Sequence, residues 1–545
     1  MVKGRNVDSK KVRVFLAVVL LMALGAAMRL TACVKGYPDL RGADESIVVN
    51  QAIGLLERRS YEADTYSWPA HFLVKGSALV FTIYSYLRFG VPATEIFPLN
   101  PASFYVLARC FGALWGVLMI PLAWWLAEKA KKGAGLFAAV FFTFFPIYIE
   151  HSGYDTPDVP LAFFTMLISA LAIRWLDRPT WGRLAALCVS VGVGISVKYT
   201  AAIGCLLIAV VVCIQAWKEK SWKLVFLGGA FSIAVVFLAF FLAAPNLVTN
   251  WQHTMWQLKI EARGSYGVGP FFSKLLRYAK TYLQASTGAA SLALTALGGI
   301  WIWKNRRAQH IPLFLGAVFW VCLSTLGLWW VRWGTPFYVA PLLLSAVGAS
   351  VAWDYVKEHW AKYRPHMRRF WKPAGAAVVV LLAVTTSVSG GCLEWMRCAA
   401  PQTVLVALDW CTQQGISYEN SIYEGYTPFA LDWSKELGVS LGEDGQLILP
   451  EDRQDAQYVL LSSIRYNRFY GDPVGSAPTV AVYEKIRKGM EQLAVFSEEI
   501  PVSYSSAVTL VNNIRRMVYF AQGGYAGGSE GQIIEIYRIS GPAVG

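Results

Sequence analysis

The chain is poor in charged residues. Asp, Glu, Lys and Arg make up 15% of its 545 residues, whereas 55% are hydrophobic and the mean hydropathy is +0.42. Soluble domains carry about 25% charged residues, so this composition argues against a soluble fold. About 20 apolar residues are needed to cross a bilayer as a helix. Apolar runs of this length, or somewhat shorter, recur up to residue 391. Because only helices satisfy their backbone in lipid without closing a barrel, the sequence predicts a polytopic helical bundle. Three such runs are VFLAVVLLMALGAAM (14–28), LVFLGGAFSIAVVFLAFFLAA (224–244) and AGAAVVVLLAVTTSV (374–388).

Several motifs with a known chemistry are also absent. The sequence has no CxxC pair, no HExxH, no phosphate-binding loop, no GxGxxG fingerprint and no evident internal repeat. These absences remove support for a motif-based metal site, a nucleotide-binding domain and an inverted-repeat transporter. The nine cysteines mostly stand singly in hydrophobic stretches, where a small buried apolar role is usual. A disulfide among Cys392, Cys398 and Cys411 stays open from the sequence.

The net charge is +14, and the positions of the basic residues indicate which side of the membrane each loop faces. Binding of nucleic acid is one explanation of such an excess, but Lys and Arg also crowd the cytoplasmic loops of membrane proteins, and we expect no nucleic-acid partner. The stretch at 71–90 carries Lys75 and Arg88 and fits an interfacial helix better than a span. With that choice every strongly basic interhelical loop is cytoplasmic. The pattern predicts a cytoplasmic N-terminus, a C-terminus outside and about 11 spans, at 13–32, 103–127, 134–151, 157–176, 182–198, 200–217, 223–244, 284–303, 312–331, 335–355 and 373–391.

The composition changes near residue 395, where polar and charged residues return. We therefore divide the chain into a membrane domain, 1–394, and an extracytoplasmic domain, 395–545. The second domain has β-like runs at 455–463, 479–486 and 532–540, and a helix-like segment at 404–414. This mixture predicts a small α/β fold beside an all-α bundle.

The predicted topology brings unusual charged and polar residues to the outer side of the membrane. Charges near a membrane core are costly, so each deserves a functional hypothesis. We take three carboxylates as catalytic candidates and six further residues as candidates for contacting substrates. The catalytic candidates are Asp44, Glu45 and Asp158, and the substrate-binding candidates are Tyr154, Asp155, Lys198, His253, Arg263 and Arg332.

Each candidate also has a plainer explanation. Asp44, Asp155 and Asp158 stand before or at predicted helices and are suitable N-caps. Lys198 and Arg332 lie at helix ends, where long cationic side chains reach toward the membrane surface.

The two candidates of the long outer loop have their own alternatives. His253 has no partner at metal-ligand spacing, so ligation is the minority interpretation. Arg263 could form a surface ion pair with Glu261.

Taken together, the candidates fit a site for a lipid carrier with a phosphate head group and a polar acceptor that arrives from outside. A carboxylate could accept the proton of an acceptor hydroxyl. Lys and Arg could stabilise the phosphate leaving group. Because a phosphate leaves as an anion, no general acid is needed.

An ordered series of short motifs resembles a known superfamily, the GT-C glycosyltransferases. The chain is most similar to the group of dolichyl-phosphate-mannose-protein mannosyltransferases and aminoarabinose transferases. The likeness covers roughly residues 12–355, and each motif alone is weak. The motifs are R29-L30, D44-E45, W68-P69, Arg109 in VLARCFGALWGVL, YDTPDVPLAFF (154–164), GVGISVKYTAA (192–202) and RWGTPFYVAPLLL (332–344).

The resemblance implies an inverting transfer of a sugar from a polyprenyl-phosphate donor to an acceptor. It also implies that Asp44 is the general base and that Glu45 and Asp158 shape the site. Lys198, and with it Arg332, would contact the carrier phosphate. Aminoarabinose transferases place a glutamate and a lysine just before the proline of the re-entrant helix. Ser67 and Trp68 stand there in this chain, so a metal site on that glutamate and a phosphate contact from that lysine are in doubt.

Two other functions stay open: a flippase or transporter of a lipid-linked glycan, and a non-catalytic membrane-anchored binding protein. The sequence gives no certain cofactor, and a divalent metal is an alternative. The expected partners are a polyprenyl-phosphate sugar, membrane lipid, and an acceptor that is a protein, a lipid or a glycan. The expected location is the plasma membrane of a bacterium.

Overall fold

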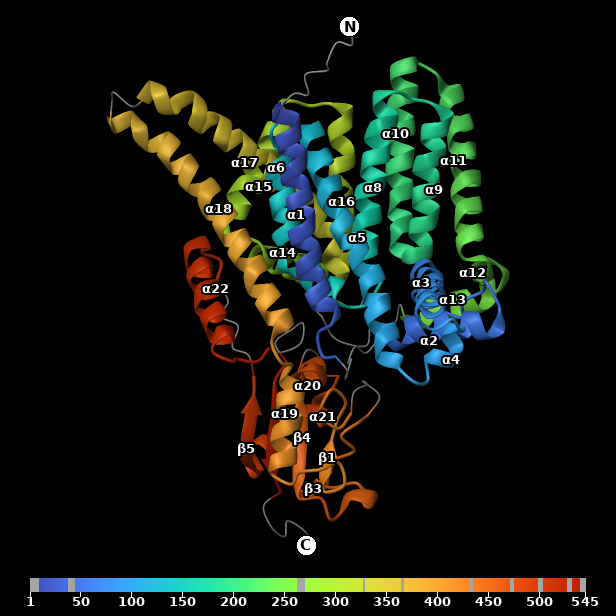
Figure 1. The fold of residues 1–545 in the computed structure, drawn as a ribbon, viewed down its shortest axis with the longest axis vertical. Helices are drawn as coiled ribbons and strands as arrows, with labels where there is room; N and C mark the ends of the chain where they lie inside the picture. Colours follow the sequence, from blue (N-terminus) through green and yellow to red (C-terminus); the bar gives the residue numbers. More distant parts are fainter. Residues whose placement is uncertain are drawn as a thin grey trace.

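The computed structural model describes residues 9–37, 45–261, 270–326, 329–363, 367–430, 435–470, 475–497, 503–526 and 532–539. A helical bundle forms the larger part, and a small α/β domain lies at one end of it, opposite the N-terminus (Figure 1). Seven stretches of the described chain are long and apolar enough to cross a membrane. They belong to α1 (Ser9–Cys33), α5 (Pro101–Ala130), α8 (Asp158–Asp177), η1 (Tyr199–Ile203) with α10 (Gly204–Glu219), α11 (Trp222–Ala243), η3 (Val331–Gly334) with α17 (Thr335–Tyr363), and α18 (Met367–Ala399).

The remaining predicted spans fall on broken or shorter helices. Two bent pairs meet the same criterion, which raises the number of spans to as many as nine. They are α6 (Gly135–Phe144) with α7 (Pro146–Ser152), bent by 52°, and α14 (Phe271–Ala285) with α15 (Ala289–Lys304), bent by 111°. The last two predicted spans are the shorter apolar α9 (Trp181–Val197) and η2 (Ala308–Phe314) with α16 (Leu315–Ser324). The chain is therefore an integral membrane protein whose spans follow the hydropathy pattern.

The break between α6 and α7 shows how a buried cation is accommodated. Pro146 begins α7, so the last carbonyls of α6 lose their helical partners. The fully buried guanidinium of Arg29 in α1 donates to two of them, at 3.0 Å from Phe142 O and 3.3 Å from Thr143 O. Arg29 thus joins α1 to the bend.

Short helices gather at the end of the bundle that carries the α/β domain (Figure 1). They are α2 (Glu45–Arg58), α3 (His71–Phe89), α4 (Ala93–Ile96), α12 (Pro245–Thr249) and α13 (Trp251–Glu261). Figure 1 shows α3 almost along its axis, whereas the bundle helices run from top to bottom. Among the described helices, α3 is not one of those long and apolar enough to cross a membrane. Its position agrees with the interfacial helix predicted at 71–90.

The α/β domain contains one four-stranded sheet with the order β1-β4-β6-β5, in which β1 and β4 are parallel and the other pairs are antiparallel. A two-stranded ladder of β2 and β3 accompanies it. The helix predicted at 404–414 and the strands predicted at 455–463 and 532–540 are confirmed. The elements are α19 (Thr403–Gln413), β1 (Ser421–Tyr423), β2 (Ser440–Leu441), β3 (Leu447–Ile448), η4 (Glu451–Arg453), β4 (Tyr458–Ser462), α20 (Ser463–Tyr470), α21 (Ala477–Gly489), β5 (Glu491–Phe496), α22 (Ser506–Ala521) and β6 (Ile534–Arg538).

The strand predicted at 479–486 is wrong, because these residues form most of α21. Val482, Tyr483 and Ile486 are buried, and their spacing of one and three residues places them on one face of a helix, whereas adjacent residues of a strand point to opposite faces. Pro478 stands at the start of the helix, where its missing N–H costs nothing.

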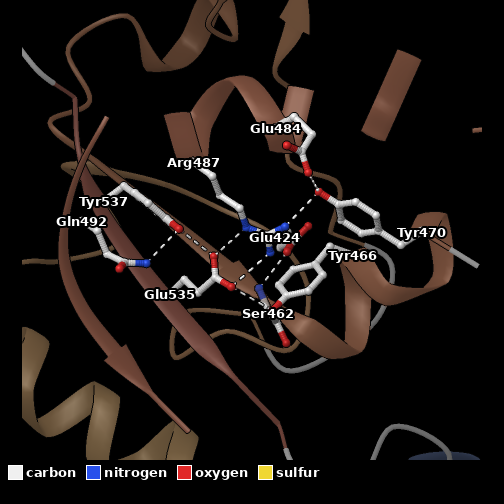
Figure 2. A network of polar contacts seen from close by, with 9 residues as sticks. All are labelled: Glu424, Ser462, Tyr466, Tyr470, Glu484, Arg487, Gln492, Glu535 and Tyr537. Carbon is white, nitrogen blue, oxygen red and sulfur yellow. Dashed lines mark hydrogen bonds and ion pairs between the residues drawn. The ribbon is translucent and has the colours of Figure 1, made fainter. Parts of the chain in front are cut away.

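A polar network fills the interior of this domain between α21, β4 and β6 (Figure 2). The buried Glu424 carboxylate accepts hydrogen bonds from the backbone N–H of Ser462 at 2.7 Å and from the Tyr483 hydroxyl at 2.5 Å. The Arg487 guanidinium pairs with both oxygens of Glu535 at 3.0 Å. Burial raises the pKa of Glu424 to about 7, and the hydrogen bonds from Ser462 and Tyr483 offset part of this rise.

Candidate functional site

The first cluster of the site forms at the N-terminus of α2, where Glu45 is paired with Arg109 of α5. The Arg109 Nε and Nη2 atoms each lie 2.7 Å from one oxygen of the Glu45 carboxylate. The third guanidinium nitrogen donates to the carbonyls of Cys33 and Lys35 at the end of α1. Glu45 also accepts the backbone N–H of Asp155 at 3.0 Å. We call Glu45 and Arg109 the closed ion pair, because only 1% and 2% of their side chains are exposed.

The second cluster forms at the N-terminus of α8, three residues after Asp155. The Asp158 carboxylate lies 2.7 Å from Lys198 Nζ and 3.8 Å from Arg332 Nε. Lys198 follows α9 directly, and Arg332 belongs to η3. We call these three residues the open ion cluster. Asp158 is 2% exposed, but Lys198 and Arg332 keep 14% and 33% of their side-chain surface exposed.

Neighbouring residues fix the open ion cluster in place. The Thr335 hydroxyl at the start of α17 donates to the carbonyl oxygen of Asp158 at 2.8 Å. The ammonium of Lys198 lies over the Trp333 ring, 5.2 Å from its centroid. The two cations are therefore oriented toward a carboxylate by rigid helix ends, which limits the loss of entropy when they bind an anion.

Asp155 stands between the two clusters and has an unusual environment. Its side chain is fully buried, and neither carboxylate oxygen has a hydrogen-bond partner among the described residues. Burial and the adjacent Glu45 carboxylate raise the pKa of Asp155 well above its usual value, and Arg109 offsets part of the shift. The preceding Tyr154 is half-buried.

Neither Asp155 nor Asp158 is the N-cap of α8, so helix capping does not explain these two aspartates. Pro157 occupies the N-cap position, and no side chain caps it. Asp158 is the first residue of the helix and binds two cations instead. Lys198 and Arg332 likewise point to a carboxylate, so interfacial snorkelling does not account for either of them.

Two of the predicted residues, Asp44 and Arg263, lie outside the described residues. The residue after Asp44 is Glu45, which is held by Arg109 and by the backbone of Asp155.

His253 is exposed and packs edge-on against the Tyr66 ring, at a centroid distance of 4.5 Å. The carbonyl of Tyr66 accepts the hydroxyl of Tyr199, the residue after Lys198, at 2.8 Å. His253 therefore lies near the chain that carries Lys198, although no contact joins its ring to the open ion cluster.

The α/β domain reaches this part of the bundle through a residue that the sequence did not single out. The guanidinium of Arg468 in α20 stacks on the Trp330 ring at 5.3 Å, and Arg332 lies over the same ring at 5.9 Å. Tyr426 accepts a hydrogen bond from Arg468 at 3.1 Å. No local signal marks Arg468, because its partner lies more than a hundred residues away.

Arg109 lies within one of the motifs on which the resemblance rests, but the sequence does not indicate its partner. An arginine inside an apolar helix requires a carboxylate or carbonyl partner, so its presence was a usable signal.

Among the described residues, no group of three or more His, Cys, Asp or Glu side chains is placed to hold a metal ion. All nine cysteines are free thiols in the structure, Cys392, Cys398 and Cys411 among them.

The architecture defines the class of protein: a polytopic membrane protein with a GT-C-type fold. The oligosaccharyltransferase of Archaeoglobus fulgidus superposes with a TM-score of 0.51 and 12% identity, over 88% of this chain and 73% of that one. The same enzyme in complex with zinc and sulfate gives a TM-score of 0.52 and 14% identity over 90% and 73%. ArnT of Cupriavidus metallidurans gives 0.46 and 14% over 89% and 97%.

A model of one family matches a stretch in the N-terminal half of the chain. The family is described as dolichyl-phosphate-mannose-protein mannosyltransferase, and the match covers residues 57–256. A search of the curated proteins gives no match. The matched range includes Arg109, Asp158 and Lys198, so the resemblance seen in the sequence is confirmed for the region that holds three of the five residues of the two clusters.

Proposed function

We propose that the protein transfers a sugar from a polyprenyl-phosphate donor to an acceptor hydroxyl at the extracytoplasmic surface of the membrane. The observation that supports this proposal best is the open ion cluster. Two cations, Lys198 and Arg332, meet at one buried carboxylate and keep exposed surface at the end of the bundle. A phosphate that arrives at this surface can bind both cations while Asp158 keeps them in position.

In the proposed reaction, the acceptor oxygen forms a bond to the anomeric carbon as the bond from that carbon to the phosphate oxygen breaks. The acceptor proton passes to the carboxylate of Asp44. The carrier phosphate leaves as an anion, and Lys198 and Arg332 stabilise the negative charge that develops on it. Attack from the face opposite the phosphate inverts the anomeric configuration.

The closed ion pair has a positioning role in this proposal. Arg109 fixes Glu45 at the first turn of α2, which fixes the chain beside Asp44. The same Glu45 holds the backbone of Asp155, three residues before Asp158. One buried pair therefore ties the segment with the proposed base to the segment with Asp158, the carboxylate that pairs with both phosphate-binding cations.

The nature of the sugar and the acceptor belongs to the proposal as well. The family match favours mannose on the carrier, since that family is named for a dolichyl-phosphate-mannose donor. The contact between Arg468 and Trp330 brings the α/β domain close to the open ion cluster, so an acceptor can meet both parts. A protein, a lipid or a glycan fits this geometry equally well.

The decisive experiment reconstitutes the purified protein in liposomes that contain polyprenyl-phosphate mannose, with other polyprenyl-phosphate sugars in parallel. Membrane and secreted fractions serve as acceptors, and release of free polyprenyl phosphate is measured. We expect release with at least one donor. Asp44→Asn is expected to lower it by about 10²- to 10⁴-fold, the contribution of a general base. Asp64→Asn removes an exposed carboxylate of the same region and is the matched control.

Two outcomes would contradict the proposal. Equal release by Asp44→Asn and by the unmodified protein would remove Asp44 from the reaction. Movement of the intact donor between leaflets without cleavage, in both proteins, would instead identify a flippase. Neither outcome affects the inference that follows, which concerns a different surface.

A further inference from the structure

The helix α22 leaves the sheet of the α/β domain and lies along the transmembrane helix α18 (Figure 1). The Asn513 amide donates to the Ser389 hydroxyl at 3.0 Å, and the Thr386 hydroxyl donates to the carbonyl of Ser506 at 3.4 Å. Ser389 and Thr386 belong to the apolar stretch Trp371–Ala399, which is long enough to cross a membrane. The first half of α22 is therefore level with the part of the bundle that lies in or near the bilayer.

The segment before α22 also caps a membrane helix. The first backbone N–H groups of α15 have no partners within their own helix. The N–H of Ala289 donates to the carbonyl of Tyr504 at 2.8 Å, and the N–H of Ala290 donates to the Ser506 hydroxyl at 2.9 Å. This close approach requires a glycine at Gly288, whose φ is +61° and where a Cβ would lie 2.5 Å from the Tyr504 carbonyl. The docking of α22 is thus built into the backbone of the bundle.

One face of α22 is apolar and uncovered. Val508, Val511, Ile514 and Val518 follow one another at spacings of three, three and four residues, which places them on one face of the helix. Between 47% and 54% of each side chain is exposed. Asn513 and Phe520 on the other side are buried. A row of four branched apolar side chains is costly in water, at about 25 cal/mol per Å² of exposed apolar surface.

We propose that α22 is inserted in the membrane interface, with this apolar row in contact with the acyl chains of the lipid. The row continues a surface that already faces lipid, because α22 lies against α18, which exposes Val378 and Leu381. Arg515 is exposed on the same face, four residues after Val511 and three before Val518, and its long side chain can extend from the apolar row toward a lipid phosphate. The α/β domain is then held at the membrane by α22 as well as by the end of α18.

The test places a photoreactive benzophenone side chain at Val511 or at Val518 of the full-length protein in lipid nanodiscs. Products are separated after irradiation, and lipid adducts are identified by mass spectrometry. Leu381 on α18 is the positive control, and Ile448 on β3, which is 52% exposed, is the water-facing control. We expect lipid adducts at Val511 and Val518 about tenfold above those at Ile448, because benzophenone reacts with groups in contact and an interfacial helix keeps its apolar face against the acyl chains.

Each other result would overturn the inference. Adduct levels equal to those at Ile448 would show that α22 faces water. Cross-links between two copies of the chain would show that the row is covered by a second molecule. The melting temperature of each labelled protein is compared with that of the unlabelled protein. If the melting temperature falls for only one of the two labelled proteins, the adducts of the other labelled protein give the result.

Discussion

The closed ion pair and the open ion cluster use the same chemistry and differ in what they leave available. All three guanidinium nitrogens of Arg109 donate to Glu45 or to two backbone carbonyls, so the pair is held without a ligand. Lys198 and Arg332 share one carboxylate at unequal distances and keep exposed surface. A complete buried pair fixes a structure, whereas cations that keep exposed surface can bind an anion. The comparison predicts that the first cluster governs stability and the second governs turnover.

The largest expected effect comes from opening the closed pair. Arg109→Met leaves the Glu45 carboxylate buried without its cation, which typically costs about 3–5 kcal/mol of stability. We expect a clear fall in the melting temperature of the protein in detergent, and with it a loss of activity. Arg58→Met removes an exposed cation from the same helix that begins with Glu45, and it should change neither quantity. If Arg109→Met melted like the unmodified protein, the positioning role of the pair would be wrong.

The second prediction reverses the balance between stability and activity. Lys198→Met should reduce kcat/KM for the donor by about 10²-fold, close to 2.7 kcal/mol of transition-state stabilisation. The fall in melting temperature should be smaller than in Arg109→Met, because Arg332 remains near Asp158. Lys198→Arg keeps the charge and should recover part of the rate. Equal losses of stability in the two methionine variants would remove the distinction between the clusters.

The sequence predicted the members of the open cluster but not their pairing. Asp158, Lys198 and Arg332 were selected because charges at helix ends near a membrane are costly. That argument applies to each residue by itself. Which carboxylate meets which cation depends on how α8, α9 and η3 pack, and Asp158 and Lys198 are 40 residues apart. The sequence predicts that Glu45 shapes the catalytic site, and the structure shows that it forms a buried pair with Arg109.

The third prediction concerns Asp155, between the two clusters. A carboxyl group whose pKa is raised on folding holds its proton more tightly in the folded state. The protonated Asp155 then contributes its full stabilisation below about pH 4, the usual pKa of Asp in an unfolded chain. This contribution falls as the pH rises toward the raised pKa of the folded state. Asp155→Asn should remove this decline and melt higher than the unmodified protein at neutral pH. Melting temperatures measured from pH 4 to pH 9 provide the test, with Asp64→Asn as the exposed control.

The smallest expected effect tests the link from the α/β domain to the open cluster. Arg468→Met removes the stacking of its guanidinium on Trp330, an interaction worth about 0.5–1 kcal/mol at exposed sites. We expect a two- to five-fold increase in KM for the donor or the acceptor, with kcat almost unchanged, since 1.4 kcal/mol is about tenfold. Arg538→Met removes an exposed pair on the sheet and is the control. An unchanged KM would show that Arg332 is positioned by the bundle alone.

The sequence by itself determined the apolar helices of the membrane domain. Hydropathy and the positions of Lys and Arg are local properties, so they predicted these helices, and the helix at 71–90, without knowledge of the packing. Local pattern was insufficient where a short apolar run suits both a strand and a helix, as at 479–486. Only the tertiary structure decided that Arg109 closes on Glu45, that Asp158 holds both cations, and that α22 returns to the bundle. These contacts join residues far apart in the chain, and their energy depends on burial and geometry that no local segment contains.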